Sequence, residues 1–183
     1  KNSHQFLITG SARLDHFRKG GDSLLGRYFY YRLHPFSLPE LGYGRQKLND
    51  LFRFGGFPET LFEKNQRTLK RWHMSRLSKL VRADLRDLET VKDLDKVEML
   101  AEELPNRVGS PLSKNSLAED LEVDPKTVKR WLEILTSLYY CYQIAPFGAP
   151  RIRAVKKEQK LYLWDWSQIE DDGARFENMV ASH

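Results

Sequence analysis

The stretch 116–135 predicts two helices joined by a tight turn, and it constrains the fold more than any other part of the chain. Ser116 and Glu119 have the spacing of a capping box, which begins a first helix that we expect to end near Glu122. Asp124 can cap a second helix, and the proline after it suits the first helical position because no backbone donor is needed there. These two start signals predict a helix-turn-helix unit.

The second helix of this pair has an apolar side and a polar side. Its apolar residues recur every three or four positions, and we expect them to face a core: Val128, Trp131, Leu132, Leu135 and Tyr139. The residues expected to point outward are Lys126, Thr127, Lys129, Arg130 and Glu133. The outward residues are placed to touch DNA phosphates or base edges, because such a helix fits a DNA groove.

A β-hairpin is expected after the second helix. Residues 139–144 are rich in strand-forming aromatic side chains, a turn rich in proline follows at 146–150, and a second strand is predicted at 160–164. Helix, turn, helix and hairpin is the order of a winged helix. The hairpin carries cations where a wing would lie against the DNA backbone: Arg151, Arg153, Lys156, Lys157 and Lys160. From Asp124 to Lys160 there are eight Lys or Arg and three acids, a surplus equal to the whole chain's net charge of +5.

Two interpretations of this winged helix remain open. One is a module that contacts DNA. The other is a non-catalytic adaptor that binds DNA or protein, because winged helices are also used for packing and exposed Lys and Arg are often only a solvated helix face.

Composition limits the possible partners and compartment. The chain has 183 residues, of which 40% are hydrophobic and 30% charged, and no stretch resembles a membrane span, so we expect a soluble protein with no membrane partner. The sequence pI of about 9.3 favours an anionic partner. The single cysteine, Cys141, lies in an apolar strand and has no disulfide partner, which indicates a reducing cytoplasm.

The remaining chain is expected to be mostly α with small β elements, an α+β fold in which a helical bundle adjoins the winged helix. The expected strands lie at 5–11 and 28–33. The expected helices lie at 37–41, 59–63, 68–88, 93–104 and 173–181, with a Gly/Pro break at 54–58. The opening strand lacks flanking strands, and the last helix lacks a downstream segment to cover its apolar face. We therefore expect a fragment of a longer protein.

Four short motifs occur in order along the chain. They are Leu-Ile-Thr-Gly-Ser at 7–11, Leu-Gly-Arg at 25–27, Leu-His-Pro-Phe-Ser-Leu-Pro-Glu-Leu at 33–41 and Phe-Gly-Gly-Phe-Pro at 54–58. This ordered set resembles a large group of uncharacterised prokaryotic AAA+ ATPases. In those proteins an ATPase core is followed by a helical and winged-helix region and then by a restriction-endonuclease-like domain.

The resemblance implies a domain organisation and several site residues. It divides the chain into the end of a AAA+ core at 1–41, a helical region at 42–105, a winged helix at 106–166 and the first helix of a nuclease-like domain at 167–183. Thr9 and Ser11 are similar to the family's first sensor, which orients the attacking water. Arg27 is similar to an arginine finger that reaches a neighbouring subunit, and this implies self-association. Glu177 is similar to a metal-binding acid of the nuclease-like fold.

Each of these roles has a simpler alternative. The residues at 9 and 11 could merely cap a strand end, and Arg27 could form an ordinary salt bridge. The acids at 165–177 could attract a metal, although we expect a solvated loop before a helix.

Departures from the family pattern limit the chemistry. The chain has no phosphate-binding loop, so ATP and Mg are cofactors expected of the longer parent protein and not of this fragment alone. The histidines have no metal-ligand spacing, and no nucleophilic triad is suggested.

Overall fold

The computed structural model describes residues 4, 6, 7, 9, 10, 29, 31–80, 93–147 and 159–183. These residues form a mostly helical structure with one small antiparallel sheet, which confirms the expected fold class. The elements, with η for a 3-10 helix, are α1 (Leu38–Leu41), α2 (Arg45–Phe54), α3 (Pro58–Glu63), α4 (Gln66–Lys79), α5 (Leu94–Glu103), η4 (Leu104–Arg107), α6 (Lys114–Asp120), α7 (Pro125–Ser137), β1 (Cys141–Ile144), β2 (Lys160–Leu163), η5 (Trp166–Gln168) and α9 (Asp172–Ser182).

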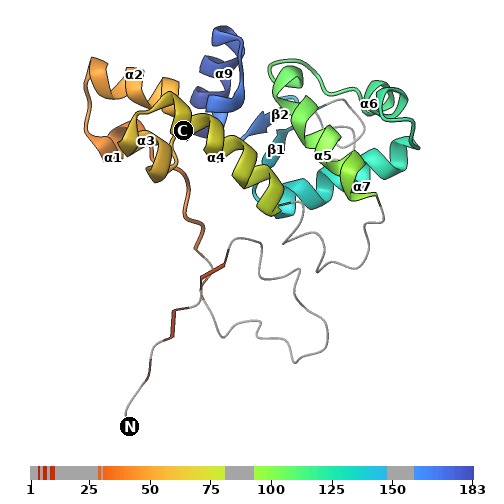
Figure 1. The fold of residues 1–183 in the computed structure, drawn as a ribbon, viewed down its shortest axis with the longest axis horizontal. Helices are drawn as coiled ribbons and strands as arrows, with labels where there is room; N and C mark the ends of the chain where they lie inside the picture. Colours follow the sequence, from red (N-terminus) through yellow and green to blue (C-terminus); the bar gives the residue numbers. More distant parts are fainter. Residues whose placement is uncertain are drawn as a thin grey trace.

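One hydrophobic core runs through most of these elements. Figure 1 shows α1, α2 and α3 at one end of the molecule, α6 and α7 at the other, and α4, α9 and the sheet between them. Fully buried side chains come from both ends, including Leu51 of α2, Leu100 of α5, Leu132 of α7 and Leu163 of β2. Residues 42–105 and 106–166, predicted from the sequence as a helical region and a winged helix, therefore pack against each other.

Local polar contacts begin the first helices. Ser37 donates from its backbone N–H and its hydroxyl to Glu40 Oε2, at 2.8 and 2.6 Å, and these bonds hold the pKa of Glu40 below its ordinary value. Asn65 caps α4 by accepting from the backbone N–H of Arg67 at 2.8 Å. α4 confirms the first part of the long predicted helix, and the part at 81–88 lies outside the described residues.

The predicted hairpin is confirmed. β1 and β2 pair in antiparallel register, with Cys141 opposite Leu163 and Ile144 opposite Lys160. Pro111, between η4 and α6, forms a further antiparallel bridge to Lys160. The helices α6 and α7 followed by this sheet have the order of helix, turn, helix and hairpin that the sequence predicts.

The strands predicted near the N-terminus are wrong for the residues that the structure describes. Residues 6, 7, 9 and 10 lie in no strand, and neither do residues 29 and 31–33. Leu33 is 99% exposed. A strand needs a partner for its backbone groups, and the described part of the chain offers none here.

The last predicted helix forms as α9, and elements that precede it in the chain cover part of its apolar face. Met179 is 4% exposed and Asn178 is fully buried. The Asn178 side chain accepts from the Leu163 N–H and donates to the Leu163 carbonyl, both at 2.8 Å. This amide ties α9 to the edge of β2, and α9 also packs on α2. Phe176 and Val180 stay about half exposed.

Two glycines let the turn between α2 and α3 approach the segment after β2. Gly55 has a φ of 76°, and a Cβ there would lie 2.8 Å from Asp165 Oδ1. A Cβ on Gly56 would lie 2.7 Å from the carbonyl oxygen of Phe36 and 2.9 Å from the Trp166 ring. The Trp166 indole in turn donates to a carbonyl of α2 at 2.9 Å. The glycine pair is therefore required by close packing.

We expect Gly56→Ala to lower the free energy of unfolding by about 2–3 kcal/mol, because a backbone oxygen and a buried ring cannot move aside. Gly173→Ala in α9 is the matched control, since its Cβ would meet only the Asp171 side chain, at 3.2 Å. Its change should stay below about 1 kcal/mol. Urea unfolding followed by circular dichroism measures both, and equal destabilisation of the two variants would contradict this account.

Candidate nucleic-acid interface

The first helix of the predicted pair, α6, begins earlier in the chain than the sequence suggests. Its N-cap is Ser113, whose hydroxyl accepts from the Ser116 N–H at 3.3 Å, so the capping box predicted at Ser116 is wrong. The helix ends two residues before Glu122, as predicted, and Glu122 takes a left-handed φ of 51° in the turn. Lys96 of α5 closes this end by donating to the carbonyls of Leu121 and Glu122, at 2.9 and 3.2 Å.

The second helix, α7, begins as predicted and presents three cations to solvent. The Asp124 carboxylate accepts from the Lys126 N–H at 2.7 Å, and Pro125 takes the first helical position. Lys126, Lys129 and Arg130 are exposed, and Thr127 is half-buried. Spacings of three and four residues place these cations on one side of the helix.

The buried side of α7 matches four of its five predicted residues. The four confirmed residues are Val128, Trp131, Leu132 and Leu135. The prediction for Tyr139 is wrong, because the helix has ended and this residue has a φ of 54°. Tyr140 is buried in its place and donates from its hydroxyl to the Ala101 carbonyl at 2.9 Å.

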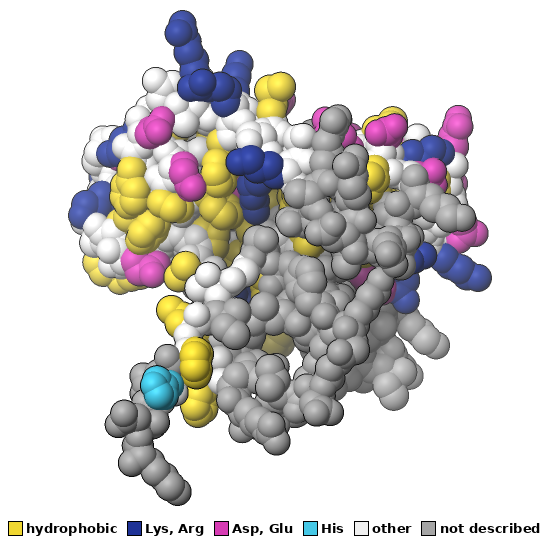
Figure 2. Space-filling view, turned by 60° about the horizontal axis from the view of Figure 1, so that its bottom comes forward, with side chains coloured by type: hydrophobic (Ala, Val, Ile, Leu, Met, Phe, Trp, Pro, Cys, Tyr) yellow, Lys and Arg dark blue, Asp and Glu magenta, His cyan; other side chains and the backbone are white. Residues whose placement is uncertain are grey.

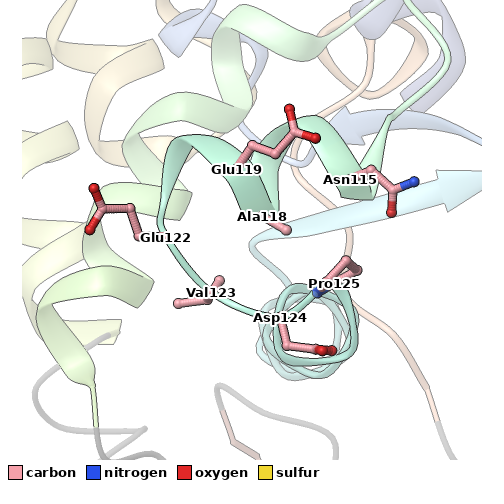
Figure 3. A pocket seen from close by; sticks show the side chains of 7 residues that line it. All are labelled: Asn115, Ala118, Glu119, Glu122, Val123, Asp124 and Pro125. Carbon is pink, nitrogen blue, oxygen red and sulfur yellow. The ribbon is translucent and has the colours of Figure 1, made fainter.

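Acidic side chains surround the start of α7. Figure 3 shows the residues that line an open hollow between α6 and α7, and they include Glu119, Glu122 and Asp124. Farther along α7, Lys129 Nζ lies 3.9 Å from Glu133. From the start of α6 to the end of α7 the chain has five acids and four Lys or Arg. The positive surplus predicted for this unit therefore depends on the wing.

The wing residues are only partly described. Arg151, Arg153, Lys156 and Lys157 lie outside the described residues, so their contact with DNA stays a prediction. Lys160, at the start of β2, donates to Glu177 Oε1 at 2.9 Å. Its charge is thus shared with an acid.

Glu177 has structural partners. Besides the bond from Lys160 it accepts from the Tyr162 hydroxyl at 2.8 Å, and these two bonds hold the pKa of Glu177 below its ordinary value. In the described part of the chain, no three His, Cys, Asp or Glu side chains are grouped to hold a metal. The metal-binding role of Glu177 stays a prediction.

The residues that the resemblance assigns to ATP hydrolysis do not form a described site. Thr9 is exposed and lies in no regular element. Ser11 and Arg27 lie outside the described residues. Their sensor and finger roles stay predictions.

The structure also contains a buried polar cluster that the sequence did not reveal. Asp165, after β2, is fully buried and accepts from Trp72 Nε1 of α4 at 3.1 Å and from the Ser167 hydroxyl. Arg76 Nη1 and His73 Nε2, also on α4, each lie 3.7 Å from Asp165 Oδ2. The expectation that Asp165 belongs to a solvated loop is wrong, because this residue follows β2 closely and is fully buried in the core.

Asp165, His73 and Ser167 have the residue types of a hydrolytic triad but not its geometry. His73 Nε2 lies 2.9 Å from the Ser167 oxygen, and the same nitrogen is the one nearest Asp165. The serine hydroxyl donates to the carboxylate. In a catalytic triad the carboxylate and the serine bind opposite nitrogens of the imidazole. The cluster therefore joins α4 to the segment after β2 and does not activate a nucleophile.

A weak signal for this cluster was present in the sequence. Asp165 stands between Trp164 and Trp166, directly after an apolar strand. Two neighbouring indoles favour burial, and a buried carboxylate needs donors. The sequence could not identify the donors, because Trp72 is 93 residues away.

Burial lowers the pKa of His73 below its ordinary value. The folded protein therefore binds this proton less readily than the unfolded chain, so its stability should fall as the pH drops below about 6.5. His73→Gln should remove this part of the pH dependence, and His4→Gln, at an exposed histidine, should retain it. Unfolding free energies from about pH 7.5 to 5 measure the difference, and identical slopes for all three proteins would contradict the prediction.

Two further observations concern membrane-spanning helices and the single cysteine. No helix in the described ranges is long and apolar enough to cross a membrane. Cys141 is a free, fully buried cysteine, as expected, and burial raises the pKa of its thiol to about 12.

Comparison with known proteins places this fold in a family. Two curated relatives, "Uncharacterized protein Rv2008c" of Mycobacterium tuberculosis and "Uncharacterized protein Mb2031c" of Mycobacterium bovis, are each 24% identical to this chain over 161 residues. The alignment covers 88% of this chain and 36% of each relative, so the chain spans about a third of their length. No solved structure matches. A family model described as "Domain of unknown function (DUF8612)" matches residues 45–168, from α2 to η5, and the chain therefore belongs to the DUF8612 family.

Proposed function

We propose that this chain is the winged-helix part of a longer AAA+ ATPase and that α7 contacts the phosphate backbone of DNA. The observation that carries the DNA contact is the row of exposed cations Lys126, Lys129 and Arg130 on the second helix of a helix-turn-helix unit. A helix in this position fits the major groove, and its cations then reach phosphates on either side.

The contacts would be made with phosphates more than with bases. Three carboxylates stand at the start of α7, where a recognition helix usually meets base edges, and they repel the DNA backbone nearby. Glu133 shares the charge of Lys129. Such a surface binds DNA weakly and with little sequence preference.

The second candidate is a non-catalytic adaptor that packs against another protein domain. The same acidic hollow between α6 and α7 favours it, because it reduces the attraction of this unit for DNA. Neutralising the cations and the acids of α7 separately distinguishes the two functions.

For DNA contact, we expect Lys126, Lys129 and Arg130 changed together to Gln to weaken binding of a random-sequence duplex. The slope of log affinity against log salt should fall by about 0.9 for each phosphate that the variant no longer neutralises. Asp124→Asn is the matched variant of opposite charge change. Asn is also a good N-cap and removes one negative charge, so the affinity for the duplex should rise. Fluorescence anisotropy at several salt concentrations measures both. If neither variant changes the slope, the adaptor function is favoured.

The ATPase part of the proposal rests on the ordered motifs that resemble AAA+ proteins. The matched relatives are about three times as long as the aligned region, which leaves room for a nucleotide-binding core elsewhere in such a protein. ATP and Mg would be bound by that core, and Arg27 would act on a neighbouring subunit. The buried free thiol of Cys141 supports a reducing cytoplasm as its compartment.

In a longer protein that contains this chain, we expect Arg27→Ala to reduce ATP turnover by about 10³-fold or more without reducing ATP binding, as for an arginine finger. Steady-state phosphate release and binding of a fluorescent ATP analogue measure the two effects. Arg32→Ala, a nearby arginine outside the motif, should leave turnover unchanged. Full turnover in the Arg27 variant would exclude the finger role.

A further inference from the structure

Helix α4 carries an unusual distribution of charge. Between Gln66 and Lys79 it has five Lys or Arg residues and no acid. Arg76 points inward, where it lies 3.7 Å from Asp165 and donates to the Tyr139 carbonyl at 3.1 Å. The other four are exposed: Arg67, Lys70, Arg71 and Lys79.

Three of the exposed cations form a row along one side of α4. Arg67, Lys70 and Arg71 are spaced by three and four residues, and Met74, which is 75% exposed, continues the same side. Leu69 lies on the opposite side and is buried, and Leu77 is buried farther along the helix. Helix α4 crosses the middle of the molecule between α1–α3 and α7 (Figure 1). Because the three cations of the row are exposed, this side faces away from the core.

The cations of this row have no acidic partners among the described residues. The ion pairs within those residues involve none of Arg67, Lys70, Arg71 and Lys79. Arg53 of α2 lies next to the start of this row. In the orientation of the Gln66 amide that satisfies its hydrogen bonds, the Gln66 side-chain oxygen accepts from Arg53 Nε at 2.9 Å. A positive surface thus continues from the end of α2 along α4.

Helix stability does not explain this row. Arg67 lies in the first turn of α4, where the partial positive charge of the helix end disfavours cations. Lys70 and Arg71 add like charges close to it. Only Lys79, in the last turn, is placed where a cation stabilises the helix.

We propose that the exposed face of α4 is a second surface that binds the phosphate backbone of DNA. From Arg67 to Arg71 the row rises by about 6 Å, which is the axial span of about two phosphates of one DNA strand. One DNA strand presents a charge about every 3.4 Å along the axis, so a linear row of cations fits this linear anion. The proposal goes beyond the α7 contact, because it concerns another helix and other residues.

Two other surfaces and partners fit less well. An anionic membrane would require a free apolar side on the helix, and the apolar side of α4 is packed in the core. Figure 2 shows hydrophobic side chains gathered at the end of the molecule that carries α1–α3, with Asp and Glu among them. Lys and Arg also lie there, but residues 38–64 have four Lys or Arg and four Asp or Glu, so this end has no net positive charge to attract DNA.

The test is Lys70→Gln with Arg71→Gln in the full 183-residue chain. Binding to a random-sequence duplex should weaken about tenfold or more at 0.1 M salt, and the salt slope should fall by about 1.8. Arg45→Gln with Lys47→Gln, exposed cations on α2, is the control with the same change of net charge, and its binding should change less than twofold. Thermal unfolding followed by circular dichroism confirms that both variants fold.

Several outcomes would overturn the proposal. Equal weakening in the α2 control would show an effect of net charge alone. Loss of binding to phosphatidylserine vesicles but not to DNA would assign the surface to a membrane. An unchanged DNA affinity for the α4 variant, together with weakened binding for the α7 variant, would leave α7 as the DNA surface and exclude α4. Unchanged binding for both variants would overturn this proposal and the α7 contact together.

Discussion

The buried carboxylate of Asp165 joins helix α4 to the segment that follows β2. It accepts from Trp72 of α4 and from Ser167 of η5, and Arg76, beside it, also binds the carbonyl of Tyr139 after α7. Gly55 leaves the space that this carboxylate occupies. Removing one partner of a buried ion pair typically costs about 3–5 kcal/mol. The cluster needs α2, α4, α7 and η5 at once, which is consistent with a family that spans all of them.

Features set by a few neighbouring residues could be predicted from the sequence. Asp124 and the proline after it define the start of α7, and the aromatic strands define the hairpin, because caps and strand preferences act locally. The cap of α6 shows the limit of this reasoning. The Leu112 N–H donates to the Gln159 carbonyl at 2.9 Å, which holds the chain extended up to Ser113. A contact with a distant segment thus selects Ser113 over Ser116.

Features that depend on distant partners could not be predicted. The stretch at 31–33 is expected from the sequence to be a strand, yet no strand among the described residues pairs with it. The Asp165 cluster combines side chains more than 90 residues apart, and only the flanking tryptophans indicated its burial. The candidate DNA-binding helix was located correctly, but its acidic surroundings became apparent only when α6 and α7 were placed side by side.

Counting charges along the sequence does not show which of them are paired with acids in the fold. The winged helix has the larger local surplus, but Lys160 is paired with Glu177 and Lys129 lies near Glu133. Helix α4 has fewer cations, yet its exposed ones have no acidic partner in the described part of the chain. An anionic ligand responds to the summed field at the surface, in which paired charges largely cancel. The row Arg67, Lys70 and Arg71 has no acidic partner in the described part of the chain, and this supports the proposal that α4 is a second surface for an anionic ligand.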